Sequence, residues 1–279
     1  MPRLSAYAVA AVRAALAAGA IQRRLLGHLT KVEFKGPRDP VTEADRASED
    51  AIVDILREAF PEHAFVGEEG GAQGTSAFTW LIDPLDGTHN YTRGLPWFAV
   101  SIALRYRGQT LVAAVYNPVL GEGYAAESGR GAYVRSLRGD EDPREWADLS
   151  GWRRLTVSTT ARLEDATLGT GFPQTVAETG VNLDHFANLI RASARLRALG
   201  SAALSLAAVA AGQMDGYWEI GPKAWDFAAG ALLVEEAGGR VTDLRGRPLD
   251  LDAGRLLATN GVVHDSVLAV LARGQSGLD

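Results

Sequence analysis

The chain has 279 residues, a length that suits one large domain or two of ordinary size. Its 47% hydrophobic and 22% charged residues are close to globular averages, which excludes a disordered or fibrous chain. It has no cysteine, which excludes disulfides, thiolate zinc sites, iron–sulfur clusters and a cysteine nucleophile. A net charge of -6 disfavours polyanions, so we expect no nucleic-acid partner.

The N-terminal segment is predicted to form an amphipathic helix at residues 4–20 rather than an export signal. Arg13 interrupts its apolar run, and Gln22, Arg23 and Arg24 end it. No run reaches the ~18 apolar residues of a membrane span. We therefore expect a cytoplasmic protein without a membrane partner.

In the first half, a helix is predicted from Thr42 to Pro61, where apolar residues recur at helical spacing. Four glycines make residues 67–74 a loop. A short buried strand at 80–82 then places Asp83 at its end. Three β-prone runs separated by turn residues predict antiparallel strands at 98–105, 111–116 and 123–126.

Charged residues crowd segment 136–151, and we place a domain boundary there, between residues 1–145 and 146–279. Beyond it, strand-like and helical patterns alternate, which predicts an α/β domain. The expected strands are 154–158, 166–171 and 217–220, and the expected helices are 183–199, 201–211, 225–237 and 266–273.

The most specific string is Asp83-Pro84-Leu85-Asp86-Gly87-Thr88, at the end of a predicted strand. Its two carboxylates can converge on one cation together with the carbonyl of Leu85. The N–H groups of Gly87 and Thr88 can bind an anion where the chain turns into a helix. Taken alone, the string also suits an Asx turn with Thr88 as an N-cap. A calcium loop is disfavoured, because the D-x-D-x-D-G alternation is absent.

Four other carboxylates lie in predicted loops or in the first turn of predicted helices, namely Asp45, Glu68, Glu69 and Asp226. Each alone has an ordinary interpretation, as a solvated turn or as a first-turn helix carboxylate. Together they form an all-oxygen cluster beside an anion site. Hard divalent cations such as Mg²⁺ require such a cluster when they act on phosphate.

Other hydrolase classes lack their motifs. The five histidines show no H-E-x-x-H spacing and are interpreted as surface or turn residues. Ser201 lacks a G-x-S-x-G elbow, and no P-loop is present.

A set of motifs follows in order along the chain: Lys35-Gly36, Asp39, Val41-Thr42, Asp45, Gly67-Glu68-Glu69, 83–91, 94–96, 98–101 and 225–230. This ordered set resembles that of the inositol monophosphatase family over nearly the full chain. The resemblance implies an α/β (α+β) fold, a layered α/β/α/β/α sandwich shared with fructose-1,6-bisphosphatases. It has an antiparallel sheet in the first half and a mixed sheet in the second.

The resemblance implies two overlapping metal sites. Glu68, Asp83 and the carbonyl of Leu85 would bind the first ion, whereas Asp83, Asp86 and Asp226 would bind the second. The cofactor would be Mg²⁺, two or three ions per site, with Mn²⁺ as a substitute.

The family's catalytic groups correspond to Thr88 and Asp45, which would activate the attacking water, together with Glu68. The N–H groups of Gly87 and Thr88 would hold phosphate. Asp86 and Glu219, with Gly200-Ser201-Ala202, would receive the substrate hydroxyls. Glu69 and Lys223 would lie next to the metal ligands without binding the metal themselves.

The activity implied is lithium-sensitive hydrolysis of a small phosphorylated polyol or sugar, with myo-inositol monophosphate as first choice. Residues 39–45 also resemble histidinol-phosphate phosphatases, and fructose 1,6-bisphosphate or a nucleotide 3′- or 2′-phosphate are further alternatives. A regulatory, protein-binding member of the family is an alternative of another class. The resemblance also suggests a homodimer.

Overall fold

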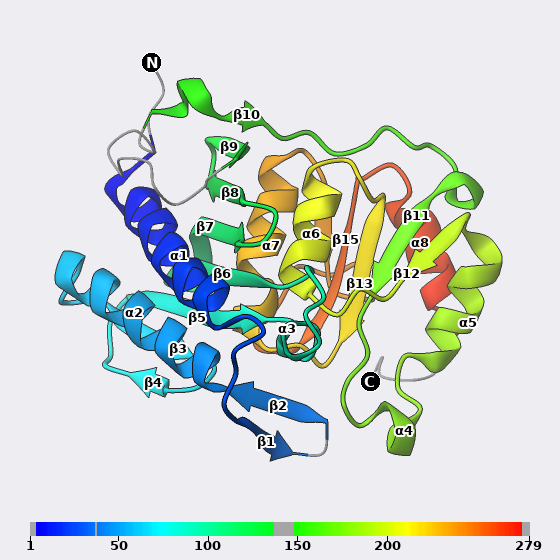
Figure 1. Ribbon diagram of the computed structural model, residues 1–279. Coiled ribbons are helices and arrows are strands. Elements are labelled where there is room, and N and C mark those ends of the chain that lie inside the picture. Colours follow the sequence, from blue (N-terminus) through cyan, green and yellow to red (C-terminus); the bar gives the residue numbers. More distant parts are fainter. Residues whose placement is uncertain (1–3, 37, 137–147, 275–279) are drawn as a thin grey trace.

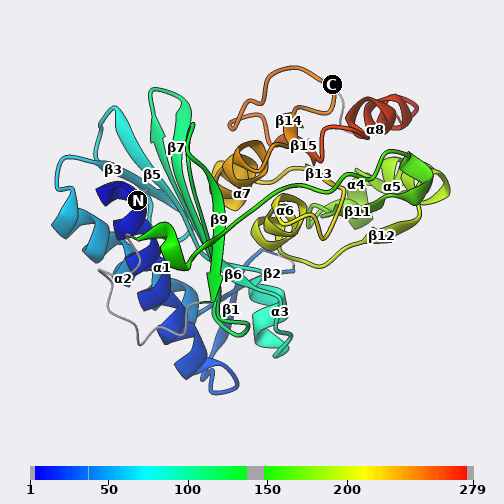
Figure 2. The same cartoon turned by 90° about the horizontal axis from the view of Figure 1, so that it is seen from above.

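The structure, a computed structural model, describes residues 4–36, 38–136 and 148–274. Its elements stack in five layers, which are seen best from above (Figure 2). Helices α1 (Ala6–Leu25) and α2 (Glu43–Ala59) cover one face of an eight-stranded sheet, and α6 (Ala202–Ala210) and α7 (Ala224–Glu236) separate it from a five-stranded sheet (Figure 1). The expected α/β/α/β/α sandwich is confirmed.

The eight-stranded sheet has the order β10-β9-β8-β7-β6-β5-β3-β4 and is antiparallel except where β3 lies parallel to β5. Its central strands are apolar on both faces, because neighbouring residues such as Ile102 and Ala103 point to opposite helix layers. The strands are β3 (Ala64–Gly67), β4 (Gly71–Gln73), β5 (Phe78–Asp86), β6 (Ala99–Tyr106), β7 (Gln109–Asn117), β8 (Glu122–Glu127), β9 (Gly131–Ser136) and β10 (Arg153–Arg154).

The five-stranded sheet is mixed, as expected, with the order β12-β11-β13-β15-β14. Strand β11 is parallel to both its neighbours, whereas β15 is antiparallel to both of its own. The strands are β11 (Thr167–Thr170), β12 (Arg195–Arg197), β13 (Gly216–Ile220), β14 (Arg240–Thr242) and β15 (Arg255–Thr259), and the outer helices are α4 (Val176–Thr179), α5 (Leu183–Ala192) and α8 (His264–Leu271).

The smaller elements are the hairpin of β1 (Val32–Gly36) and β2 (Asp39–Thr42), the short helix α3 (Thr88–Thr92), and two 3-10 turns, Leu149–Gly151 and Leu163–Asp165. No helix among the described residues is long and apolar enough to cross a membrane. Most of the charged segment 136–151 lies outside the described residues. The division into residues 1–145 and 146–279 stays a prediction.

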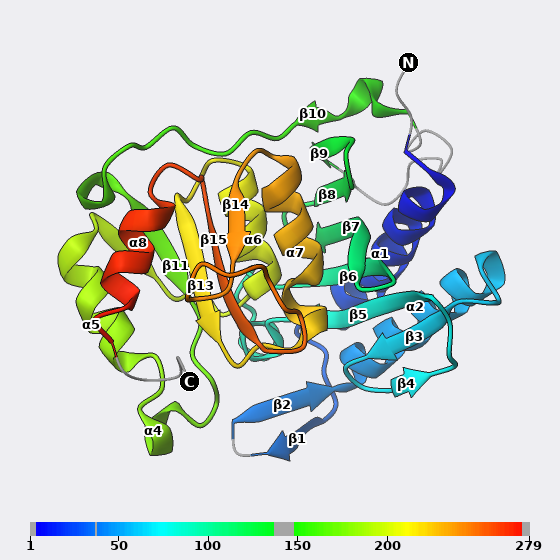
Figure 3. The same cartoon turned by 180° about the vertical axis from the view of Figure 1, so that it is seen from behind.

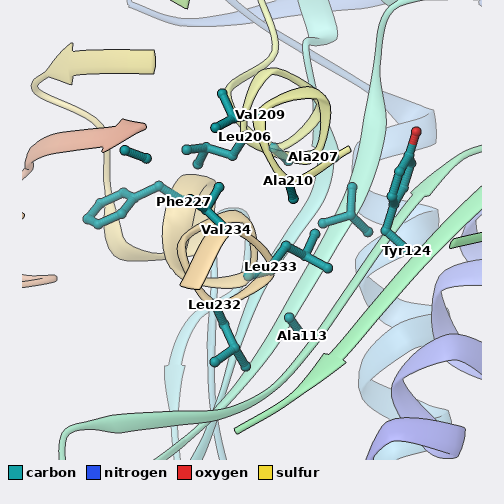
Figure 4. Close-up of a cluster of buried hydrophobic side chains, with 14 of the residues drawn as sticks. Ala113, Tyr124, Leu206, Ala207, Val209, Ala210, Phe227, Leu232, Leu233 and Val234 are labelled. Atoms are coloured by element: carbon teal, nitrogen blue, oxygen red, sulfur yellow. The ribbon is translucent and has the colours of Figure 1, made fainter. Parts of the chain in front are cut away.

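One apolar cluster joins the two sheets through α6 and α7 (Figure 4). Leu206 and Val209 of α6 and Phe227 and Leu233 of α7 are all buried in it. The two helices approach closely at Gly230, where a Cβ atom would lie 2.5 Å from the Cβ of Leu206. The middle layer therefore depends on a small residue at this position.

The expected helix at 183–199 is wrong in its second half. Helix α5 ends at Ala192, and Ser193 turns the backbone to an extended conformation. Residues Arg195–Arg197 then form β12, which pairs in parallel with β11 at the sheet edge. The alternation of Arg195, Leu196 and Arg197 is a strand period that the helical reading overlooked.

The interpretation of the histidines as surface or turn residues is also wrong for two of them. His185 and His264 are fully buried. The imidazole of His264 lies 2.9 Å from the hydroxyls of both Thr242 and Thr259, which satisfies both ring nitrogens. Burial lowers the pKa of His264 to about 4, so this ring is neutral and structural.

We predict that Gly230→Ala destabilises the fold by about 1 to 3 kcal/mol, because the new methyl group overpacks the α6–α7 contact. The higher helix propensity of alanine alone would stabilise the fold by ~1 kcal/mol. The sign of the change in unfolding free energy therefore separates the two effects. Urea denaturation measures the change. Gly36→Ala is the control, since no atom lies within 4 Å of its new Cβ. A Gly230→Ala protein as stable as its parent contradicts the prediction.

Candidate metal and phosphate site

A cavity of about 290 Å³ opens where the end of β5 meets the N-terminal ends of α3, α6 and α7. The structure brings nearly all of the predicted site residues to its wall. Asp45, Glu69 and Lys223 do not line it. The predicted residues that do are Glu68, Asp83, Leu85, Asp86, Gly87, Thr88, Gly200, Ser201, Ala202, Glu219 and Asp226.

Strand β5 carries the two motif aspartates on one side because of a β-bulge. Residues three apart in a regular strand point to opposite faces. Here Asp83 pairs with Ser101 and Asp86 with Ala99, so β5 has one more residue than β6 between these two pairs. The extra residue turns both carboxylates into the cavity.

Thr88 connects the motif to α2. Its hydroxyl oxygen lies 2.9 Å from Asp45 Oδ1 and 2.9 Å from the carbonyl oxygen of Leu85. Asp45 is fixed in turn by a capping box, in which its Oδ2 accepts from the N–H and hydroxyl of Thr42 at 2.8 and 2.6 Å. Burial raises the pKa of Asp45 to about 6. The sequence predicted this pair, and the structure places it in hydrogen-bond contact.

The turn before Thr88 requires glycine. Gly87 has φ 95°, and a Cβ atom there would lie 3.0 Å from the carbonyl oxygens of both Gly200 and Trp97. This conformation places the backbone of Gly87 and Thr88 at the start of α3, where first-turn N–H groups have no partner within the helix. The geometry suits an anion.

Asp86 joins the first half of the chain to α6. Its Oδ2 accepts from the hydroxyl of Ser201 at 2.6 Å and the N–H of Ala203 at 2.7 Å, and its Oδ1 accepts from the N–H of Ala202 at 3.3 Å. These bonds satisfy first-turn donors of α6, with Ser201 as its N-cap. Asp86 is therefore fixed at the helix N-terminus, where its charge is favourable.

The side chain of Asn90 fixes the loop before α6. Its amide donates to the carbonyl of Trp97 at 2.7 Å and of Leu199 at 2.8 Å. A Cβ atom at Gly200, which has φ 77°, would lie 3.0 Å from this amide nitrogen. Asn90 thus connects the segment after the Asp83–Thr88 motif to the loop that precedes α6.

Asp226 and Glu219 enter from the second half. Asp226 Oδ2 accepts from the N–H of Lys223 at 2.7 Å, so Lys223 supports Asp226 through its backbone. The hydroxyl of Tyr217 donates to Glu219 Oε2 at 2.6 Å, and burial raises the pKa of Glu219 to about 7. Both carboxylates face the cavity.

Glu68 and Glu69 both form ion pairs with Lys35, which lies on β1. Lys35 Nζ lies 2.7 Å from Glu68 Oε1 and 2.7 Å from Glu69 Oε1. Lys35 is part of the motif set that resembles the family, but the sequence predicted no function for its side chain. Its ammonium group supplies local positive charge to the acidic cluster.

Sequence reasoning missed Glu49, which holds the Glu68–Glu69 turn from behind. Its carboxylate accepts the N–H of Glu69 at 2.9 Å and of Gly70 at 2.5 Å. A Cβ atom at Gly67 or Gly70 would lie 2.5 or 2.6 Å from this carboxylate, which explains two of the loop glycines. Glu49 could have been found from its position four residues after Asp45, which places both side chains on the same face of α2.

The cluster carries more negative charge than its surroundings balance. Burial and the charges of Glu68, Asp86 and Asp226 raise the pKa of Asp83 well above its usual range. Burial and the charge of Asp86 do the same to Asp226. A bound cation would relieve this repulsion.

The donor set is that of a hard cation, with carboxylate and carbonyl oxygens only. In the part of the chain that the structure describes, no three acidic or histidine side chains are placed to enclose one ion. Asp86, Asp226 and Glu68 each face a protein donor instead. The chemistry of the residues fits Mg²⁺, and the ligand set itself stays a prediction.

Residues 3–276 match the inositol monophosphatase family. The chain belongs to this family. It is 44% identical over 271 residues to the Nus factor SuhB of Pseudomonas aeruginosa, with 94% of each chain covered, and 41% identical over 267 residues to the inositol-1-monophosphatase of Mesorhizobium japonicum, again with 94% of each covered. The solved inositol monophosphatase of an Anabaena (Nostoc) species superposes with a TM-score of 0.83 at 38% identity, covering 98% of this chain and 97% of that one.

We predict that Asp226→Asn stabilises the metal-free protein, because the amide keeps an oxygen for the Lys223 N–H and removes one repelling charge. A gain of about 2 to 4 °C in melting temperature is expected, the shift that about 1 kcal/mol gives in a chain of 150–250 residues. Mg²⁺ should raise the melting temperature of the parent more than that of the variant. Thermal denaturation with EDTA and with Mg²⁺ measures both.

The control is Asp54→Asn, at an exposed position on α2. It should behave as the parent does under both conditions. A metal-free Asp226→Asn protein less stable than the parent shows that the carboxylate stabilises this turn more than it repels its neighbours.

Proposed function

We propose that this family member is a Mg²⁺-dependent phosphate monoester hydrolase for a small phosphorylated polyol, with myo-inositol monophosphate as first choice. The observation that carries the proposal is the Thr88 hydroxyl, 2.9 Å from both Asp45 Oδ1 and the carbonyl of Leu85, beside a buried carboxylate cluster. The family and the relative named inositol-1-monophosphatase support the same reaction.

Each group has a distinct part in the proposed reaction. When bound, Mg²⁺ would supply an activated water and stabilise the negative charge of the leaving oxygen. The N–H groups of Gly87 and Thr88 hold the phosphate, and the Thr88 hydroxyl takes a proton from the attacking water as it gives its own proton to Asp45. Glu68, Asp83, Asp86, Asp226 and the Leu85 carbonyl are the proposed metal ligands.

Substrate hydroxyls would meet Glu219 and the loop 200–202. Glu219 offers carboxylate oxygens to a hydroxyl donor, and its bond to Tyr217 fixes its orientation. A pocket that hydrogen-bonds hydroxyl groups selects polyols over apolar alcohols.

Release of phosphate from a substrate panel tests the activity. The panel holds myo-inositol 1-phosphate, histidinol phosphate, fructose 1,6-bisphosphate and nucleotide 3′- and 2′-phosphates, each assayed with Mg²⁺ and then with EDTA. We expect the highest kcat/KM for the inositol phosphate and no release with EDTA. No release from any compound would refute a phosphatase function.

The second candidate function is regulatory. The relative from Pseudomonas aeruginosa is named a Nus factor and covers 94% of this chain at 44% identity. If the panel yields no phosphate, this name favours a binding role. The absence of a nucleic-acid partner and the homodimer both stay predictions.

We predict that Thr88→Ala lowers kcat by ~10² to 10⁴, the range for loss of a positioned proton-transfer group, with little change in KM. Thr88→Ser should retain most activity, because it keeps the hydroxyl. Asp45→Asn should resemble Thr88→Ala, and the double variant should be barely worse than either. Steady-state kinetics compares the four proteins. If Ser is as poor as Ala, or the two losses multiply, Thr88 and Asp45 do not form a relay.

We predict that Glu49→Gln weakens Mg²⁺ binding about 10- to 100-fold, as expected for loss of a group that orients a metal ligand. Turnover at saturating Mg²⁺ should be largely restored. The dependence of activity on Mg²⁺ concentration measures both quantities. Asp50→Asn, an exposed neighbour on α2, removes the same charge without touching the turn and should match the parent. Equal Mg²⁺ requirements in the two variants would show that Glu49 has no specific effect on Mg²⁺ binding through the Glu68–Glu69 turn.

A further inference from the structure

A second cavity, of about 570 Å³, lies at the margin between α7 and the first sheet. It shares no lining residue with the acidic cavity. Its walls come from β3, β5 and the residues before it, the end of β6 with the β6–β7 turn, and the segments 221–225 and 251–254. Figure 3 shows the chain between β14 and β15 passing beside the start of α7 on this side of the molecule. Its volume is within the range of small-molecule sites.

The charge of this cavity is opposite to that of the whole chain. Three cationic side chains line it, Arg105, Arg107 and Lys223, against one carboxylate, Asp252. The lining thus carries two net positive charges in a chain whose net charge is -6. Apolar groups such as Leu81 and Trp225 complete the walls.

The cationic groups of this cavity are weakly paired. Arg105 meets Asp252 only at 3.5 Å, and the Asp252 side chain is 73% exposed. The Nε of Arg105 is buried, and no described residue accepts a hydrogen bond from it. Arg107 and Lys223 form no ion pair with any residue that the structure describes; Arg107 lies over the ring of Tyr106. Such groups are available to an incoming oxyanion.

Segment 221–226, which lies between the two cavities, is held by backbone hydrogen bonds. The N–H of Gly221 donates to the carbonyl of Gly254 at 2.8 Å. Gly254 has φ 60°, and a Cβ atom there would lie 2.7 Å from the carbonyl of Pro222. The same segment continues to Lys223, whose N–H holds the carboxylate of Asp226. Segment 221–226 therefore connects the lining of one cavity to the lining of the other.

We propose that this cavity binds a small, multiply charged oxyanion, and that the bound anion alters the acidic site through the turn from Gly221 to Asp226. The recognised chemistry is a phosphate or carboxylate group on a small molecule, gripped by the guanidinium groups of Arg105 and Arg107 and by Lys223. The binding part stands on the cavity alone, whereas the regulatory part rests on the proposed phosphatase function.

Calorimetric titration of the EDTA-treated protein tests the binding part. Without metal, the acidic cavity repels anions, so bound anion reports the second cavity. Inorganic phosphate and citrate serve as the two probes and distinguish phosphate from carboxylate recognition. At least one probe should bind, and the double variant Arg105→Gln/Arg107→Gln should bind it at least tenfold more weakly.

The matched control is Arg13→Gln, an exposed position on α1 at the other face of the sheet. It removes a positive charge far from the cavity and should leave affinity within twofold. Circular dichroism and melting temperature establish that the variants are folded. Binding of neither probe, or equal weakening by Arg13→Gln, overturns the proposal.

Hydrolysis of myo-inositol 1-phosphate at fixed free Mg²⁺ tests the regulatory part. The probe that binds should change the rate at least twofold more in the parent and in Arg13→Gln than in the double variant, where phosphate can act only as a product bound at Gly87 and Thr88. An unchanged rate with bound probe overturns the regulatory part. Absence of hydrolysis in every protein would instead refute the phosphatase function, while the calorimetric result still decides the binding part.

Discussion

The Asp86 carboxylate links the two halves of this protein at the point where its chemistry is proposed to occur. It comes from the end of β5 and accepts three hydrogen bonds from the start of α6, more than a hundred residues further along the chain. Because these bonds satisfy the helix N-terminus, the geometry of the site and the docking of the middle layer depend on one another. A displacement of α6 would move Asp86, and loss of Asp86 would leave helix donors unpaired.

The concentration of negative charge around Asp83 is the main energetic cost of this arrangement. Burial and repulsion both raise its pKa, so the metal-free site is under electrostatic strain. Lys35, Glu49 and the capping box of Asp45 fix neighbouring groups from the outside. A bound cation would stabilise such a site. Active sites commonly lower the stability of the free protein in this way, because the groups needed for activity repel one another.

Much of this could be read from the sequence. The string from Asp83 to Thr88, the glycine at position 87 and the acid at 226 indicated the chemistry, because short motifs report local backbone needs and donor types. The helices at α1 and α2 followed from apolar spacing. Two segments were misread. Residues 154–158 were expected to form a strand, but β10 covers only Arg153–Arg154. In segment 183–199, a three-residue edge strand follows a helix too closely for periodicity to separate them.

The sequence by itself determined which side chains could serve as donors and the family to which the chain belongs. Tertiary structure alone decided that Glu49 accepts hydrogen bonds from the Glu68–Glu69 turn, that Asp86 accepts hydrogen bonds from the first turn of α6, and that Lys223 lines a second, cationic cavity. These facts depend on which face of a bulged strand a residue occupies and on how two sheets pack across α6 and α7. Spacing along a chain carries no information about contacts between segments that only packing brings together.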